Sequence, residues 1–203
     1  MATDPVQHLS PGEYLAFERR GETKHEYAGG EVFAMTGASL GHNVIVAHLV
    51  AELDVQFRGR PCRVFASDLR VAVSPDGPFY YPDVVALCAE PRLLDDERDT
   101  LLNPEVVIEV LSPSTEAFDR GLKFSHYRAI PSVREVVFVA QDRARVEHFA
   151  CRDDDQWLLT DHAGLEAAVE LPAVGCRLEL ARVYDKVEID LGTGVGAGDR
   201  ASG

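Results

Sequence analysis

The sequence has few cations and no long apolar run. Its 203 residues include 20 Lys and Arg against 34 Asp and Glu, which gives a formal net charge of −14. This charge disfavours a broad, non-specific grip on nucleic acid, because such binding depends on Lys and Arg neutralising phosphates. A local basic strip remains open at Arg58, Arg60, Arg63 and Arg70, although these side chains could equally be solvated.

Cysteines and membrane signals are also scarce. No stretch approaches the length of a membrane span, and the first nine residues lack the basic and then apolar pattern of a signal peptide. The four cysteines (Cys62, Cys88, Cys151, Cys176) are scattered, with no Cys-x-x-Cys pair. Scattered cysteines in strand-like contexts are more often buried thiols than disulfides or zinc ligands. We therefore expect buried thiols and a cytoplasmic protein without a membrane contact.

The composition, 46% hydrophobic and 27% charged, is typical of one ordinary globular domain. We expect this domain to span residues 1–190, followed by a flexible Gly-rich tail at 191–203. Expected helices begin with the capping box at Ser10–Glu13 and run over 40–57, 115–129 and 181–187. Expected strands lie at 31–35, 62–66, 69–73, 79–88, 104–111, 135–140, 144–149, 156–160 and 167–171, with a polar loop at 89–103.

The order of these elements predicts a mixed α/β fold. A buried strand, a helix and a second apolar strand form a crossover unit with parallel pairing, whereas the hairpin-like strands should pair antiparallel. We expect a mixed α/β sandwich with a central sheet flanked by helices.

A carboxylate in the most apolar run of the chain is the first candidate functional group. Glu109 lies within Pro104–Leu111, a β-branched run that is typical of a strand covered on both faces. An ionised Glu without partners there would cost several kcal/mol or have a raised pKa, and a Lys, an Arg or a metal ion would compensate its charge. Alternatively, Glu109 reaches solvent at the strand end.

Asp83 occupies a similar place, directly before the apolar run Val84–Leu87. If the two strands are neighbours, the carboxylates of Asp83 and Glu109 converge and require a cation. Oxygen ligands suit Mg²⁺ or Mn²⁺ better than zinc. The alternative for Asp83 is a turn cap beside Pro82.

The expected helix at 115–129 adds a cation. Its helical wheel predicts an inward stripe of Phe118, Leu122, Ser125 and Ala129, with Asp119, Lys123 and Tyr127 on the neighbouring face. Lys123 could fold back toward the two acids and stabilise a charged transition state. The alternative is an ordinary surface pair between Asp119 and Lys123.

Several motifs together resemble one protein family. The run Glu26–Met35, His42, Tyr81-Pro82-Asp83, and Glu109–Thr115 followed by Asp119, Lys123 and Tyr127 resemble the Uma-type (Uma-two) family of restriction endonucleases, over about Glu13 to Tyr184. The resemblance implies a restriction-endonuclease-like fold with a mixed sheet core, additional antiparallel strands and a divalent metal.

The resemblance also implies roles for particular residues. Asp83 and Glu109 match the two acids, and the carbonyl of Val110 would complete the metal ligands. Leu111 stands where the wider superfamily has a Lys, so Lys123 would supply that cation. Glu31 resembles the further acid that such nucleases add from the N-terminal region, although it could simply follow the turn at Gly29-Gly30.

His42, Asp119 and Tyr127 are secondary candidates for the same site. A lone His is more often a capping or packing residue than a base or ligand, and Asp68 is best explained as a turn residue. The Ser112 and Ser114 hydroxyls are explained by helix capping, and no nucleophile elbow supports a Ser–Lys hydrolase.

The leading hypothesis is a Mg²⁺- or Mn²⁺-dependent endonuclease that hydrolyses DNA and acts as a homodimer. One alternative is a non-catalytic member of the fold that binds a protein partner, which the acidic charge and Leu111 favour. Another is a metal-dependent hydrolase of a small nucleotide.

Overall fold

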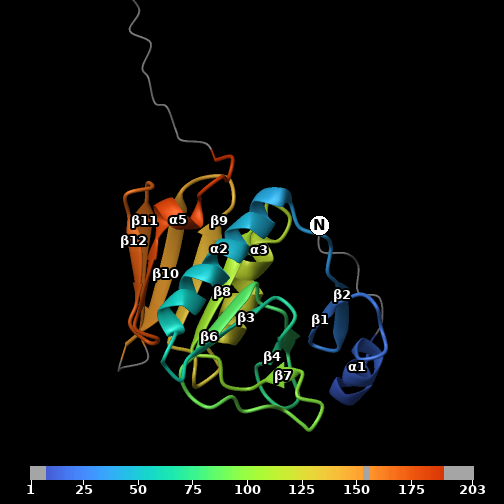
Figure 1. Ribbon diagram of the computed structural model, residues 1–203. Helices are drawn as coiled ribbons and strands as arrows, with labels where there is room; N and C mark the ends of the chain where they lie inside the picture. The colour runs from blue at the N-terminus through green and yellow to red at the C-terminus, as the bar shows by residue number, and fades with distance from the viewer. Residues whose placement is uncertain (1–7, 153–155, 190–203) are drawn as a thin grey trace, which may run out of the picture.

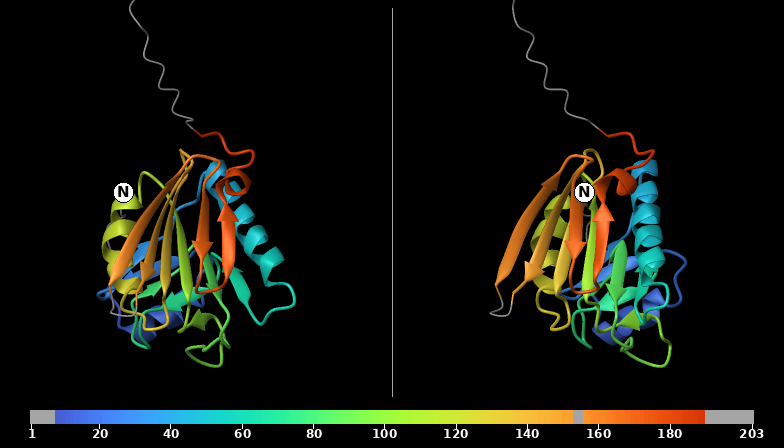
Figure 2. Two further views of the ribbon diagram at one scale, coloured as in Figure 1. Left: turned by 90° about the vertical axis from the view of Figure 1, so that its left-hand side faces the viewer. Right: turned by 60° about the vertical axis from the view of Figure 1, so that its left-hand side comes forward.

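The computed structural model describes residues 8–152 and 156–189, so the predicted tail at 191–203 lies outside the described residues. The described chain forms a mixed α/β structure in layers, with helices on both faces of a long central sheet (Figures 1 and 2). A smaller sheet and helix α1 (Pro11–Glu18) lie beside it, on the right of Figure 1. Helix α1 begins with the predicted capping box, in which Ser10 and Glu13 bond each other's backbone.

The central sheet has the strand order β11-β10-β9-β8-β6-β3. Its strands are β3 (Arg63–Ala66), β6 (Val84–Leu87), β8 (Val106–Leu111), β9 (Glu135–Ala140), β10 (Arg145–Cys151) and β11 (Trp157–Ala163). Strands β8 and β9 are parallel, and the other neighbours pair antiparallel. The predicted crossover unit is therefore confirmed.

One face of this sheet is covered by α2 (Leu40–Phe57), whose bounds are those expected from the sequence. Ser39 caps the helix, and Ile45, Leu49, Leu53 and Phe57 are its buried side chains. The same layer contains β12 (Ala168–Leu171), β13 (Cys176–Glu179) and α5 (Leu180–Val183). Figure 2 shows α2 on one side of the sheet and the helical segment after β8 on the other.

The smaller sheet has the order β2-β1-β5-β4-β7 and lies beside the central sheet. Its strands are β1 (His25–Ala28), β2 (Glu31–Ala34), β4 (Arg70–Ala72), β5 (Phe79–Tyr80) and β7 (Thr100–Leu101). No strand was expected in the polar loop at 89–103. Strand β7 forms within this loop because its residues pair with β4. The expected strand at 79–88 is wrong as one element, because it divides at Pro82-Asp83 into β5 and β6 of different sheets. Proline cannot donate to a sheet ladder, which favours a break there.

Two of the four cysteines contradict the expectation of buried thiols. Cys62 and Cys88 form a disulfide with an S–S distance of 1.98 Å, whereas Cys151 and Cys176 are free. The residues before β3 and after β6 lie opposite each other, because Arg63 pairs with Leu87 in the antiparallel ladder. Sequence spacing alone did not indicate this pairing, and the cysteines no longer support a cytoplasmic location.

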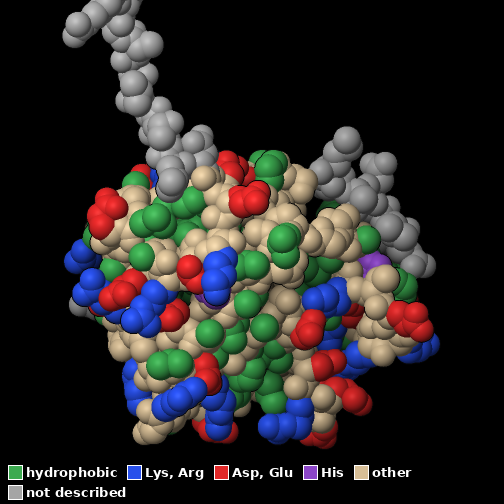
Figure 3. Space-filling view, turned by 45° about the horizontal axis from the view of Figure 1, so that its top comes forward, with side chains coloured by type: hydrophobic (Ala, Val, Ile, Leu, Met, Phe, Trp, Pro, Cys, Tyr) green, Lys and Arg blue, Asp and Glu red, His purple; other side chains and the backbone are tan. Residues whose placement is uncertain are grey.

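The four arginines at which the sequence left a basic strip open do not form a row of free cations. Arg58 pairs with Asp54 and Arg63 with Glu90, while the buried Arg70 pairs with Asp99. Arg60 donates to backbone carbonyls at the turn between β12 and β13. Figure 3 shows a face on which Lys and Arg side chains are interspersed with Asp and Glu. Within residues 8–152 and 156–189, no helix is both long enough and apolar enough to cross a membrane.

The packing of α2 predicts a clear difference between two neighbouring substitutions. Leu53 is fully buried against the sheet, whereas Val55 is 56% exposed. We expect Leu53→Ala to lower the free energy of unfolding by about 3 kcal/mol, because it removes buried methyl groups and leaves a cavity. Val55→Ala is the matched control and should change it by less than about 0.5 kcal/mol. Chemical denaturation measures both, and equal losses would contradict this packing.

Candidate active site

Asp83 and Glu109 lie opposite each other on neighbouring strands. Val84 pairs with Ile108 at the end of the β6–β8 ladder, so the next positions outward are Asp83 and Glu109. Directly opposite residues of an antiparallel pair share a face of the sheet. The Asp83 N–H lies 3.4 Å from Glu109 Oε2, and the Val110 N–H donates to Asp83 Oδ2 at 2.8 Å. The backbone thus orients both carboxylates toward one place.

Lys123 joins this pair from the other side. Its Nζ lies 2.7 Å from Glu26 Oε1, 3.2 Å from Glu109 Oε1 and 3.3 Å from Asp119 Oδ1. The Lys123 side chain is only 6% exposed, so the alternative of a surface pair with Asp119 is wrong. The structure brings Glu109, Lys123 and Asp119 into one buried cluster, and the partly buried Asp83 lies at its edge, in contact with Glu109.

The inward face of this helical segment differs from the expected stripe. Leu122 is 43% exposed and Ser125 and Ala129 are exposed, whereas Asp119, Lys123 and Tyr127 are buried. Phe118 alone of the expected stripe packs against the core. The predicted stripe was wrong because a helical wheel assigns the most hydrophobic face to the core. Here the helix faces buried carboxylates, which require a cation, so the face that carries Lys123 is turned inward.

The helix itself is interrupted by a π-helical turn. It consists of α3 (Glu116–Phe118), the π-turn η1 (Asp119–Lys123) and α4 (Phe124–Tyr127), in place of one expected helix. The Phe124 N–H bonds the carbonyl of Asp119, five residues back. Such turns are rare and frequently occur at functional sites. Here the turn carries both Asp119 and Lys123 toward Glu109.

Glu26 is the acid that sequence reasoning missed. It lies in β1, is buried, and its Oε1 accepts from the Tyr81 N–H at 3.3 Å as well as from Lys123. Glu31, the predicted N-terminal acid, lies beside the hairpin turn and pairs with Ala28. The hydrogen bonds and ion pairs of the described residues do not connect it to the cluster. Glu109 was recognised because it is an acid within a predicted strand. The same signal did not indicate Glu26, because β1 was not recognised as a strand.

His42 and Tyr127 each contact one of the two central acids. His42 Nε2 lies 3.2 Å from Asp83 Oδ2, which fixes this ring nitrogen as the donor because a carboxylate only accepts. His42 Nδ1 is buried and has no partner within the described part of the chain. The Tyr127 hydroxyl donates to Glu109 Oε1 at 2.6 Å. Asp68 is exposed and pairs with Lys24, as expected of a turn residue.

Burial dominates the electrostatics of the cluster. It raises the pKa of Glu109 to about 8, although Lys123 opposes this shift, and it also raises the pKa of Glu26. Burial alone would lower the pKa of Lys123, but Glu109, Glu26 and Asp119 together raise it well above its usual value. The two directions are compatible, because one ammonium is stabilised by all the acids while each acid receives only a share of one positive charge.

The donor set fits a divalent cation only with help from backbone and water. Among residues 8–152 and 156–189, no group of three or more His, Cys, Asp or Glu side chains is placed to hold a metal ion. Mg²⁺, however, keeps several waters and commonly uses one or two carboxylates. Asp83, Glu109 and the Val110 carbonyl would therefore suffice, and the surplus of buried negative charge favours an added cation.

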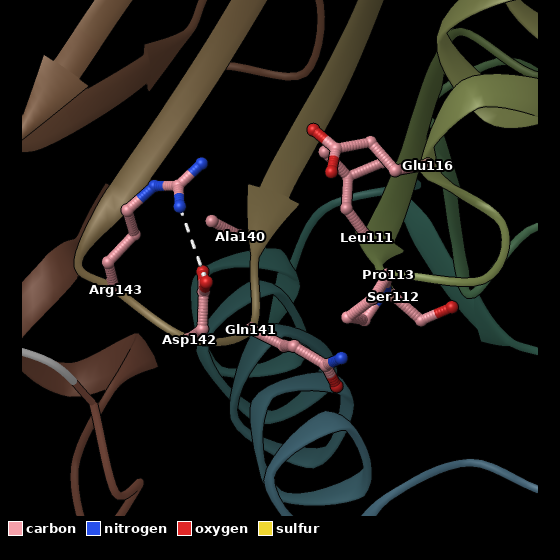
Figure 4. A pocket seen from close by; sticks show the side chains of 8 residues that line it. All are labelled: Leu111, Ser112, Pro113, Glu116, Ala140, Gln141, Asp142 and Arg143. Atoms are coloured by element: carbon pink, nitrogen blue, oxygen red, sulfur yellow. Dashed lines mark hydrogen bonds and ion pairs between the residues drawn. The ribbon is translucent and has the colours of Figure 1, made fainter.

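A small cavity lies just beyond the site, at the carboxyl ends of the parallel strands β8 and β9 (Figure 4). Its volume is about 30 Å³, and its lining includes Leu111, Ser112, Gln141 and Arg143. Figure 4 shows Arg143 paired with Asp142 at its edge. A space of this size holds a water molecule or two and is too small for a nucleotide.

These features define a class of protein. A mixed sheet flanked by helices, with two acids opposite each other on neighbouring central strands, is a restriction-endonuclease-like fold. A solved structure described as "a putative nuclease belonging to DUF820", from Anabaena variabilis ATCC 29413, superposes with a TM-score of 0.72 over 87% of this chain and 98% of that chain, at 17% identity.

The family follows from sequence comparison. The model of the Uma2 family, described as "Putative restriction endonuclease", matches residues 11–182, and the chain belongs to this family. The uncharacterized protein sll1609 of Synechocystis sp. (strain ATCC 27184 / PCC 6803 / Kazusa) is 36% identical over 170 residues, or 84% of this chain and 96% of that protein. The uncharacterized protein slr1290 of the same strain is 34% identical over 182 residues, or 89% of this chain and 93% of that protein.

The raised pKa of Glu109 predicts how stability depends on pH. Because this pKa rises from an ordinary 4.5 to about 8, the folded protein holds a proton that the unfolded chain releases. The contribution of Glu109 to the free energy of unfolding therefore falls as the pH rises from 4.5 toward 8. Glu109→Gln should flatten the decline in this window, measured by denaturation at several pH values without divalent metal. The exposed Glu90→Gln is the control, and an unchanged slope in Glu109→Gln would contradict the assignment.

Proposed function

We propose that this protein is a divalent-metal-dependent endonuclease that hydrolyses phosphodiester bonds in DNA. The observation that carries the proposal is the convergence of Asp83, Glu109 and Lys123 from three separate segments of the chain, with Glu109 in contact with both of the others. Membership of the Uma2 family supports the same activity.

The proposed metal ligands are Asp83, Glu109 and the carbonyl of Val110. Mg²⁺ or Mn²⁺ held there would lower the pKa of a bound water and offset charge on the phosphodiester. Lys123 would hold the attacking water or stabilise the negative charge of the transition state. Glu26, which contacts Lys123 directly, takes the place that the sequence had suggested for Glu31.

The neighbouring side chains support these groups. His42 donates to Asp83 and Tyr127 donates to Glu109, so each central carboxylate has a fixed orientation. Asp119 contacts only Lys123 among these residues and orients its ammonium. Fixed orientation matters because a misplaced catalytic group loses much of its effect.

The proposed substrate contact is local and does not rely on a basic groove. The net charge is −14, and the four arginines Arg58, Arg60, Arg63 and Arg70 are already paired with carboxylates or backbone carbonyls. DNA binding should therefore be weak at physiological salt.

We also propose that two copies act together, which would allow cleavage of both strands, and that the protein works in the cytoplasm, where it would meet DNA.

Removing one central acid tests this function. We expect Asp83→Asn to reduce nicking of supercoiled plasmid in Mg²⁺ or Mn²⁺ at least about 100-fold, because it removes a charged ligand of the proposed metal. Asp68→Asn changes an exposed Asp and is the matched control, with activity expected to equal the wild type.

Two results would contradict the proposal. One is nicking that Asp83→Asn leaves unchanged, since cleavage would then not depend on this site. The other is a wild-type protein that neither binds Mn²⁺ nor nicks DNA under any metal, which would favour the non-catalytic, partner-binding alternative.

A further inference from the structure

Lys123 occupies the position of a cation inside the acid cluster. Its ammonium has carboxylate oxygens of Glu26, Glu109 and Asp119 within 3.3 Å, and it is buried with them. Its longest contacts are with Glu109 and Asp119, and its shortest is with Glu26. The buried acids thus already have an internal counter-ion.

Glu109 is the residue over which two cations would compete. Its Oε1 accepts from both Lys123 and Tyr127, whereas among the described residues its Oε2 has only the long contact with the Asp83 N–H. A divalent ion bound between Asp83 and Glu109 would lie within a few ångströms of the ammonium, beside the buried Glu109 side chain. Like charges at such a distance repel strongly where the dielectric is low.

The surroundings of Lys123 offer it another position. Glu26 and Asp119 both contact the ammonium, and the rings of Tyr80 and Phe118 lie 5.6 and 5.9 Å from Nζ, which is cation–π range. Asp119 and Lys123 lie at the two ends of the π-turn η1 and therefore move with one element.

We propose that Lys123 is the resident counter-ion of the acid cluster and competes with the divalent cation for Glu109, withdrawing to Glu26 and Asp119 when the cation binds. Asp119 is then a positioning residue that acts through Lys123. This inference rests on the proposed function, because it assumes the same metal ligands, but it concerns binding and not cleavage.

The direct test is a titration with Ca²⁺, a hard divalent cation, by isothermal calorimetry. We expect Lys123→Met to bind Ca²⁺ at least about 10-fold more tightly than the wild type, since the competing charge is gone. Lys24→Met removes an equal charge from a partly exposed pair with Asp68 and is the control, with unchanged affinity.

A double-mutant cycle tests the role of Asp119. Asp119→Asn should weaken Ca²⁺ binding in the wild type, because the ammonium loses one alternative partner and stays on Glu109. In the Lys123→Met background the same substitution should have a several-fold smaller effect. Equal effects in the two backgrounds would show that Asp119 does not act through Lys123, which overturns that part of the inference.

A second measurement does not depend on a variant that folds. In wild-type protein with ¹⁵N-labelled lysine, Ca²⁺ should shift the Nζ resonance of Lys123 and leave that of Lys24 unchanged. Calcium binding that depends on Asp83 but leaves the Lys123 resonance in place, or a Lys123→Met affinity no tighter than the wild type, overturns this inference and leaves the proposed function standing. Absence of any Ca²⁺ or Mn²⁺ binding to the wild type overturns the proposed function, and this inference with it.

Discussion

The contact of one ammonium with three carboxylates holds the centre of this structure together. Lys123 lies between Glu26 from the smaller sheet, Glu109 from the central sheet and Asp119 from its own helical segment. Buried acids without a cation would lose their charge or destabilise the fold. Removing the ammonium alone, or the carboxylates alone, would leave buried charges without a partner. This costs far more free energy than the loss of a surface ion pair. The two sheets and the helical segment therefore contact one another at a place where the buried charges must balance.

The architecture explains how residues so distant in sequence reach this place. The break at Pro82-Asp83 lets the chain leave the smaller sheet after β5 and enter the central sheet at β6, so Asp83 lies where the two sheets meet. Strand β1 brings Glu26 to the same junction, where the Tyr81 N–H bonds it. The crossover between β8 and β9 carries Lys123 back over Glu109. The proposed chemistry uses this junction, because it supplies oxygen ligands and a cation away from bulk water.

Much of this could be predicted from the sequence, and the failures have physical causes. A charge within a Val- and Ile-rich run indicated Glu109, and Asp83 was expected to converge with it if their strands were neighbours. The antiparallel register that places Asp83 opposite Glu109 came from the structure. Helix α2 followed from the break at Gly37–Ser39 before it and from Gly59 and Pro61 after it. The helical wheel failed at Lys123 because periodicity assumes that apolar residues face inward, and it cannot show a π-turn. Glu26 was missed because a four-residue strand is defined by its neighbours, and the Cys62–Cys88 pair because scattered cysteines do not reveal their partners.

We propose that Asp83 and Glu109 bind a divalent cation, and that Lys123 balances their charge when the cation is absent. Anomalous diffraction from crystals soaked in Mn²⁺ tests it most directly. We expect an anomalous peak between the two carboxylates, next to the Val110 carbonyl, with the Lys123 ammonium moved off Glu109 toward Glu26 and Asp119. A crystal that binds Mn²⁺ elsewhere, with Lys123 still in contact with Glu109, would contradict it.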